Sequence, residues 1–380
     1  MEIIRYTEEH AIFRQSIRKF FEREVIPYVD QWEEDGIVPR AVWKRMGEEG
    51  FLAMSVPEEY GGLGADFLYS VILVEELCRT NHAGLAAPLH SDVVVPYIVS
   101  YASEELKRKY LPGCVSGDII TAIAMTEPNT GSDLASIRTT AVEDGNDVII
   151  NGQKTFISNG INSDLVVVAA RDPKVENPHM ALDLYLVEAD TPGFQKGKKI
   201  KKIGWHSQDT AELFFLDCRV PKANRLGQKG SGFLMLMEKL QQERLMVCVT
   251  AVPAAEHMLE QTIRYCKERI AFGRQISKFQ NTQFKIVEMA TEVKIGRAFL
   301  DKLISDHMDG KNIVVEVSMG KYWLTEMAMR VADGCLQLHG GYGYCEEYPI
   351  ARAWRDMRVM QIFAGTNEIM KGIAAKFMGL

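Results

Sequence analysis

The chain has 380 residues, of which 47% are hydrophobic and 25% are charged, ordinary values for a globular protein of two or three domains. Its net charge of −7 and isoelectric point near 5.7 argue against a nucleic-acid-binding protein or a polybasic membrane-binding surface. No run of about 18 apolar residues predicts a membrane span, and the N-terminus lacks the basic-then-apolar pattern of a signal peptide.

The cysteines and histidines favour neither a disulfide framework nor a metal site. The seven cysteines are scattered without a CxxC pair, and the eight histidines form no HxxxH cluster. We therefore expect reduced thiols and no bound metal. This predicts a cytoplasmic protein, or one of the mitochondrial matrix if a transit peptide has been removed.

The first zone, residues 1–119, shows apolar residues at helical spacing, interrupted by prolines and a glycine pair as helix ends and loops should be. One such apolar stripe consists of Phe13, Ile17, Phe20, Phe21 and Val25. We expect an N-terminal helical domain.

The second zone, residues 120–229, consists of short β-rich runs bounded by Gly, Asn, Asp or Pro. The clearest runs are residues 148–150, 165–168, 184–187 and 213–216. Residues 144–147 (DGND) predict a hairpin turn. Because no helical pattern separates the runs, an antiparallel barrel or sandwich fits better than a βαβ unit.

The helical period returns in the third zone, residues 230–380, so the fold class is α+β. Here Glu243 falls in one helical row with Leu236, Leu240 and Val247. A carboxylate on an apolar stripe is expensive to bury without a partner. It is either a structural ion pair with Arg244 or Lys239, or a functional carboxylate of raised basicity.

Five segments resemble, in order and spacing, motifs of the acyl-CoA dehydrogenases, and the likeness covers essentially the whole chain. They are residues 124–133 (AMTEPNTGSD), 151–160 (NGQKTFISNG), 269–274 (RIAFGR), 337–344 (QLHGGYGY) and 361–369 (QIFAGTNEI). The long-chain branch of the family is the nearest likeness. The resemblance implies an N-terminal helical domain, a central β-barrel-like domain and a C-terminal four-helix-bundle-like domain.

The position before the Gly-Thr pair of the last motif departs from the pattern of many relatives. There they carry the glutamate that removes the substrate's α-proton, whereas this chain has Ala364, which cannot accept a proton. The long-chain and isovaleryl branches carry their base at the position that matches Glu243. The resemblance therefore implies that Glu243 is the base and that the backbone N–H of Ala364 still contacts the thioester oxygen.

The resemblance also implies FAD as cofactor and a set of binding residues. The residues that match cofactor contacts are Met125, Thr126, Ser132, Phe156, Ser158, Arg269, Phe272, Phe279, Gln280, Gln337, Gly341, Thr366 and Glu368. The residues that match substrate contacts are Ser132, Arg244, Phe363 and Gly365. By analogy Arg269 reaches the FAD of a neighbouring subunit, with Gln337, Gly341 and Thr366 on the partner side. Phe156 stands where many relatives have tryptophan, and Glu368 where some have glutamine.

The function implied is α,β-dehydrogenation of an acyl-CoA, with a long or branched acyl group and electrons passed to an electron-transfer flavoprotein, in a homotetramer. Three alternatives remain open. They are a short branched-chain dehydrogenase, a flavin-dependent oxidase or monooxygenase on the same fold, and a non-catalytic interaction protein.

Overall fold

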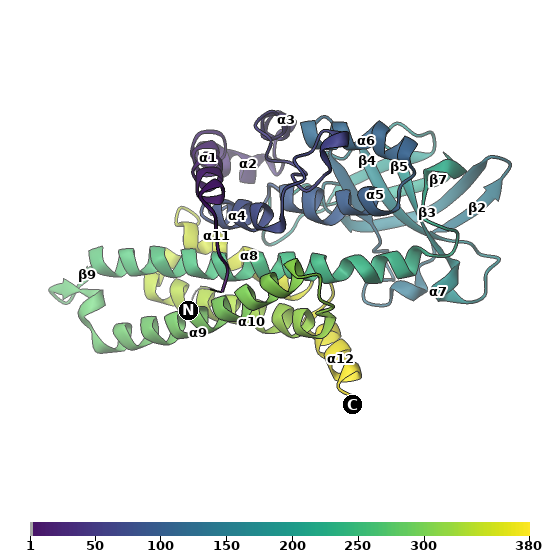
Figure 1. The fold of residues 1–380 in the computed structure, drawn as a ribbon. Helices are drawn as coiled ribbons and strands as arrows, with labels where there is room; N and C mark the ends of the chain where they lie inside the picture. The colour runs from purple at the N-terminus through teal and green to yellow at the C-terminus, as the bar shows by residue number, and fades with distance from the viewer. Residues whose placement is uncertain (1–2) are drawn as a thin grey trace.

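A computed structural model describes residues 3–380, and in it helices come first, a β-sheet follows, and helices return towards the C-terminus (Figure 1). The helices of the first part are α1 (Glu8–Glu24), α2 (Val29–Asp35), α3 (Arg40–Glu48), α4 (Phe67–Cys78), α5 (Val95–Tyr101) and α6 (Glu104–Ser116). A π-helical segment, Leu89–Val94, leads directly into α5. The first two residues of the expected N-terminal domain lie outside the described part.

Helix α1 forms where the apolar stripe predicts it. Thr7 caps its first turn by accepting a hydrogen bond from the backbone N–H of His10. Ile17, Phe20 and Phe21 are fully buried, since the stripe packs into the same core as the C-terminal helices. The predicted amphipathic helix is confirmed.

The strands of the central part include all four predicted runs. They are β1 (Thr121–Ala124), β2 (Thr140–Asp144), β3 (Asp147–Ile157), β4 (Leu165–Arg171), β5 (Leu182–Glu188), β6 (Phe194–Lys199), β7 (Ala211–Pro221) and β8 (Arg225–Leu226). A single short helix, α7 (Pro178–Ala181), interrupts them. The predicted hairpin turn is confirmed, because Asp144 pairs with Asp147 at the end of the antiparallel β2–β3 ladder.

The expectation of a purely antiparallel, barrel-like sheet needs correction. The strand order is β6-β7-β3-β2-β4-β5-β8, with β1 pairing parallel to β4, and the end strands of this order do not pair with each other among the described residues. Strands β2 and β4 are also parallel and meet at one residue pair, Thr140 and Arg171. The sheet is therefore mixed and open. The β2–β3 hairpin lies between β1 and β4 in the chain. Strands β1 and β4 therefore enter the sheet from the same edge and pair in parallel.

Strands β4 and β5 are buried on both faces, which explains their unbroken apolar sequences. One face packs with the β3 and β7 side chains into a core inside the sheet. The other face packs against α5, α6 and the start of the first C-terminal helix. The sheet is thus fixed to the helices on the side where the candidate site lies.

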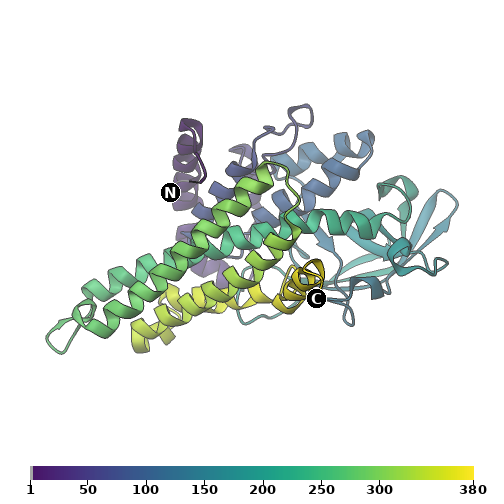
Figure 2. The same ribbon diagram turned by 60° about the horizontal axis from the view of Figure 1, so that its bottom comes forward.

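The C-terminal part is dominated by three long helices that run beside one another (Figure 2). Its elements are α8 (Gly232–Glu268), the short hairpin β9 (Ile270–Ala271) and β10 (Arg274–Gln275), α9 (Gln280–Met308), α10 (Val314–His339), α11 (Pro349–Met357) and α12 (Asn367–Phe377). Helix α10 packs against each of the other four helices, so the shorter α11 and α12 complete the bundle.

Helix α8 runs the length of the molecule, from beside the sheet to the β9–β10 hairpin at the opposite end (Figure 1). At about 1.5 Å per residue its 37 residues extend about 55 Å. None of the helices in residues 3–380 has the length and apolarity needed to cross a membrane.

Candidate active site

Glu243 lies inside the molecule, about three turns from the start of α8. It is buried together with Leu236, Leu240 and Val247, as the helical row predicts. Its Oε1 accepts a hydrogen bond of 2.7 Å from the hydroxyl of Tyr97 on α5. Burial raises the pKa of Glu243 to about 7, and the Tyr97 hydrogen bond and nearby basic side chains oppose that rise.

The alternative of a structural ion pair is not what the structure contains. Within residues 3–380, neither Arg244 nor Lys239 comes within ion-pair distance of Glu243. Lys239 instead donates to the Ser100 hydroxyl. Arg244 is also buried, makes no ion pair there, and its Nε has no hydrogen-bond partner. Two adjacent buried ionisable groups without ion-pair partners are expected where a ligand completes the site.

The loop before α12 presents a free backbone donor. Ala364 has φ 52° and Gly365 has φ 87°, so both are in the left-handed region. Within the described chain the N–H of Ala364 has no hydrogen-bond acceptor. A strained alanine with an unused N–H is consistent with an oxyanion donor, a role that requires no side chain.

Lys321 ties this loop to α10. Its side chain is fully buried on α10, and its Nζ donates to the Gly365 carbonyl at 2.7 Å and to Asn367 Oδ1 at 3.2 Å. Burial lowers the pKa of Lys321 to about 8, and the charge of Arg244 contributes in the same direction. Lys321 therefore holds the Ala364 loop against α10, within electrostatic reach of the buried Arg244 on α8.

A buried ion pair fixes the loop after β1. Lys154 Nζ lies 2.9 Å from Glu127 Oε1 and 3.0 Å from the Met125 carbonyl. Burial lowers the pKa of Lys154 to about 8. Burial would raise the pKa of Glu127, but Lys154 and hydrogen bonds from residues 138–139 hold it below its usual value. This anchoring sets the positions of Met125 and Thr126, and Met125 packs in the same core as Tyr97.

Phe156 and Ser158 lie beside that loop, because the Thr155 N–H donates to the Thr126 carbonyl. A bulge between Lys154 and Ile157 gives Phe156 φ 58° and leaves its ring 64% exposed. An aromatic ring pushed out of a strand beside partly buried polar groups is a suitable face for a flat ligand. Ser132 is exposed further along the loop after β1, which also carries Met125 and Thr126.

The sheet and the Ala364 loop also touch. The Trp205 ring packs edge-on against Phe363, with centroids 5.4 Å apart. The backbone N–H of Trp205 donates to Asp356 Oδ1 at 2.6 Å, which holds this contact in place. Thr366 caps α12 by accepting from the Ile369 N–H, and Glu368 is exposed in the first turn of that helix.

We call these residues the base-end group. It comprises Met125, Thr126, Ser132, Phe156, Ser158, Glu243, Arg244, Phe363, Ala364, Gly365, Thr366 and Glu368. The sequence analysis missed four side chains that position the group, namely Tyr97, Lys154, Trp205 and Lys321. A buried tyrosine or lysine on an otherwise apolar helical row is a signal that could have revealed Tyr97 and Lys321. Lys154 on strand β3 and Trp205 in the β6–β7 connection carry no such signal.

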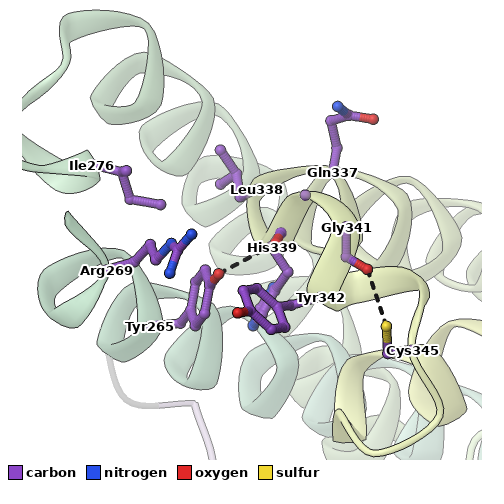
Figure 3. Close-up of a pocket in the computed structure, with 10 residues that line it drawn as sticks. Tyr265, Arg269, Ile276, Gln337, Leu338, His339, Gly341, Tyr342 and Cys345 are labelled. Carbon is purple, nitrogen blue, oxygen red and sulfur yellow. Dashed lines mark hydrogen bonds between the residues drawn. The ribbon is translucent and has the colours of Figure 1, made fainter. Parts of the chain in front are cut away.

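The remaining predicted residues lie at the other end of α8 (Figure 3). Arg269, Gln337 and Gly341 line one open depression of about 430 Å³. Arg269 lies over the Tyr342 ring, 5.2 Å from its centroid, and has no carboxylate partner in residues 3–380. From the family resemblance, Gln337 and Gly341 are expected to contact FAD from the subunit opposite to the one that carries Arg269. The structure places them beside Arg269, so all three would reach a ligand from the same chain.

Phe272 lies in the turn of the β9–β10 hairpin, and Phe279 and Gln280 follow at the start of α9. Together with Arg269, Gln337 and Gly341 we call these residues the hairpin-end group. The Phe272 ring is 96% exposed and the residue has φ 52°. Gln280 begins α9 and is exposed. A fully exposed aromatic ring held in a strained conformation suggests contact with another molecule.

Glu243 and Arg269 are separated by about 39 Å along α8, at 1.5 Å per residue. A single dinucleotide is shorter than this distance. The two groups of one chain therefore cannot bind the two ends of the same cofactor.

Comparison with known proteins agrees with this geometry. Models of the acyl-CoA dehydrogenase N-terminal, middle and C-terminal domains match residues 7–118, 122–218 and 230–379. The chain belongs to the acyl-CoA dehydrogenase family. It is an oxidoreductase of that family, as the sequence resemblance predicted.

Relatives of this acyl-CoA dehydrogenase are similar over its whole length. The long-chain specific acyl-CoA dehydrogenase of pig mitochondria (Sus scrofa) is 46% identical over 98% of this chain and 86% of its own. A crystal structure of an acyl-CoA dehydrogenase from Geobacillus kaustophilus is 57% identical, covers 99% of both chains and has a TM-score of 0.97. The FAD complex of PigA covers 99% of both chains at 26% identity and a TM-score of 0.92.

FAD fits the residues that this acyl-CoA dehydrogenase presents. Arg269 supplies a cation without an acidic partner for a pyrophosphate. Glycines 340 and 341 have open space where a side chain would begin, so a ligand can approach the backbone there. At the base end, the exposed ring of Phe156 offers a face for a flavin. No group of three or more His, Cys, Asp or Glu in residues 3–380 could hold a metal ion.

Proposed function

We propose that this enzyme dehydrogenates the α and β carbons of an acyl-CoA thioester to give the trans-2-enoyl-CoA, with FAD as cofactor and Glu243 as base. The observation that carries the proposal is Glu243 itself. It is a buried carboxylate without a cationic partner in the described chain, in a family member with alanine at the alternative base position.

Proton removal needs a carboxylate close to the α-carbon and shielded from water. Burial gives Glu243 a pKa of about 7, so it is substantially ionised near neutral pH and more basic than an exposed glutamate. Arg244, buried beside it and without a partner, is suited to hold a polar group of the substrate.

The charge that develops on the thioester oxygen needs a fixed donor. The free N–H of Ala364 provides one, and Lys321 holds the loop through the Gly365 carbonyl. Phe363 and Gly365 flank this donor and would contact the thioester, with Ser132 on the facing loop.

FAD, when bound, would supply the redox chemistry as the hydride acceptor. Met125, Thr126, Phe156 and Ser158 would contact the flavin ring, and Thr366 and Glu368 the adjoining part of the cofactor. The hairpin-end group would bind the pyrophosphate and adenosine of a second copy's FAD. This arrangement requires at least a dimer, and the family resemblance suggests a tetramer of two such dimers.

The acyl group is a long straight or branched chain. The 46% identity to a long-chain specific enzyme supports this choice. So does Ala364, whose small side chain leaves more room than a glutamate would. We further propose an electron-transfer flavoprotein as acceptor and the cytoplasm as location, which agrees with seven cysteines that form no disulfide.

The decisive experiment replaces Glu243 with glutamine, which preserves size and shape but not basicity. FAD and acyl-CoA should still bind, while anaerobic flavin bleaching slows by about 10²–10⁴-fold or more. Glu238→Gln, an exposed change on the same helix, is the matched control and should react normally. Near-normal bleaching in the Glu243 variant would refute the assignment.

The same bleaching assay, run over straight and branched acyl-CoAs of increasing length, tests the substrate. The largest kcat/KM should fall among the long or branched chains. A maximum at four carbons or fewer would refute the long-chain proposal. Rapid reoxidation in air without an enoyl-CoA product would instead indicate an oxidase.

A further inference from the structure

Tyr97 is the only described side chain that donates a hydrogen bond to Glu243. It lies on α5, one of the helices between the sheet and α8, and its side chain is fully buried. The hydroxyl is 2.7 Å from Oε1, while Oε2 accepts no hydrogen bond within residues 3–380. Tyr97 thus occupies one oxygen of the carboxylate and leaves the other available.

We propose that Tyr97 is a positioning residue for the reaction, which orients the Glu243 carboxylate and stabilises its ionised form through this hydrogen bond. The inference rests on the proposed role of Glu243 as base. It assigns the proton-accepting position to Oε2 and the fixed position to Oε1.

The arrangement is needed because a buried carboxylate would otherwise tend to hold its proton. Burial opposes ionisation of Glu243, and a phenol that donates to Oε1 favours it. Burial and the neighbouring carboxylate raise the pKa of Tyr97 well above its usual value, so the phenol stays protonated and acts only as a donor. It therefore cannot replace Glu243 as the base.

Other ionisable groups surround the carboxylate and bear on any pH effect. Lys239 and Arg244 lie on α8 itself, and Lys321 on α10 interacts with Arg244. Asp92, on the π-helical segment before α5, accepts a hydrogen bond from Gln242 through its backbone carbonyl. Burial raises the pKa of the Asp92 carboxyl to about 7, so it could titrate in the same range as Glu243.

The test compares the pH dependence of kcat/KM for the FAD-loaded wild type and Tyr97→Phe. Loss of the donor should move the midpoint of the rise in activity up by about one pH unit, because a hydrogen bond to a charged group and one pKa unit are of similar size. The limiting kcat should fall about tenfold, since a freely rotating carboxylate is misplaced part of the time. KM should change less than about threefold.

Tyr101→Phe is the matched control. Tyr101 lies one turn further along α5, with its ring 6.2 Å from that of Tyr97, and it does not donate to Glu243. Asp92→Asn is the second control. It should leave the midpoint unchanged if the rise in kcat/KM with pH reflects the ionisation of Glu243. A midpoint that moves in Asp92→Asn but not in Tyr97→Phe would overturn the proposal.

A merely structural Tyr97 would give a different result, namely lower activity or stability with an unchanged midpoint. If Tyr97→Phe does not fold, 3-fluorotyrosine at position 97 keeps the shape and makes the phenol a stronger donor. The midpoint should then move down, and an unchanged midpoint would refute the proposal. Failure of the base assignment is separate, because it would appear as an active Glu243→Gln enzyme whatever Tyr97 does.

Discussion

The two ends of α8 are built differently. At the base end the polar groups are buried and held by hydrogen bonds from distant parts of the chain, as with Glu243 and Tyr97 or Lys321 and Gly365. At the hairpin end Arg269 and Phe272 are exposed and have few partners within the chain. The first end is organised by its own chain, whereas the second has the exposed side chains expected if, as proposed, a second copy completes it. Substitutions at the base end should therefore affect folding or chemistry, and those at the hairpin end should affect assembly and cofactor retention.

Glu127→Gln should show the largest effect on stability. Removing one partner of a buried ion pair costs about 3–5 kcal/mol, because the Lys154 ammonium remains buried. Denaturant unfolding measures this change. Glu143→Gln is the control, since its partners Lys222 and Lys229 are at the surface and its loss should cost much less than that of Glu127. Equal losses in the two variants would mean that the base end is not specially organised.

Arg269→Ala should weaken FAD binding by about 1.5–3 kcal/mol, or roughly 10- to 150-fold, with little change in the unfolding of the subunit. Flavin retention on dilution and gel filtration together measure this effect. Lys267→Ala, an exposed cation two residues earlier, is the control and should retain FAD. A monomeric wild type that holds FAD tightly would contradict the proposed sharing between subunits.

Ala364→Glu added to Glu243→Gln should restore part of the lost flavin reduction. In relatives the loop position reaches the same α-carbon, but a misplacement of about 1 Å can cost roughly 10²-fold, so recovery should be partial. It should favour straight chains over bulky ones, because the new carboxylate fills the space beside alanine. If FAD and acyl-CoA bind without any recovered bleaching, the loop is not a vacated base position.

Ala364→Gly should show the smallest effect. Alanine in the left-handed region destabilises the folded state by about 1 kcal/mol. Glycine avoids this strain but destabilises the folded state by a similar amount, because its unfolded chain has more conformational freedom. Stability should change by less than about 1 kcal/mol and kcat by only a few-fold, because the backbone N–H remains. A large loss of rate would show that the methyl group itself has a role.

The features predicted from sequence were those that depend on neighbouring residues. The hairpin at residues 144–147 and the buried row around Glu243 follow from local periods of two and about 3.6 residues. The parallel β1–β4 pairing and the Tyr97–Glu243 bond join segments far apart in the chain. No local pattern encodes such a contact, which is why the sequence predicted the buried position of Glu243 but not its hydrogen-bond donor, Tyr97.

The length of α8 has a consequence for mixed assemblies. If each chain of a dimer binds the other chain's cofactor through Arg269, each α8 helix contributes to two active sites. It supplies Glu243 to one site and Arg269 to the other. A hybrid of one Glu243→Gln subunit and one Arg269→Ala subunit would gather both defects in one site and leave the other intact. When the two impaired homodimers are mixed and reassembled, each hybrid dimer should therefore regain up to half of the normal activity.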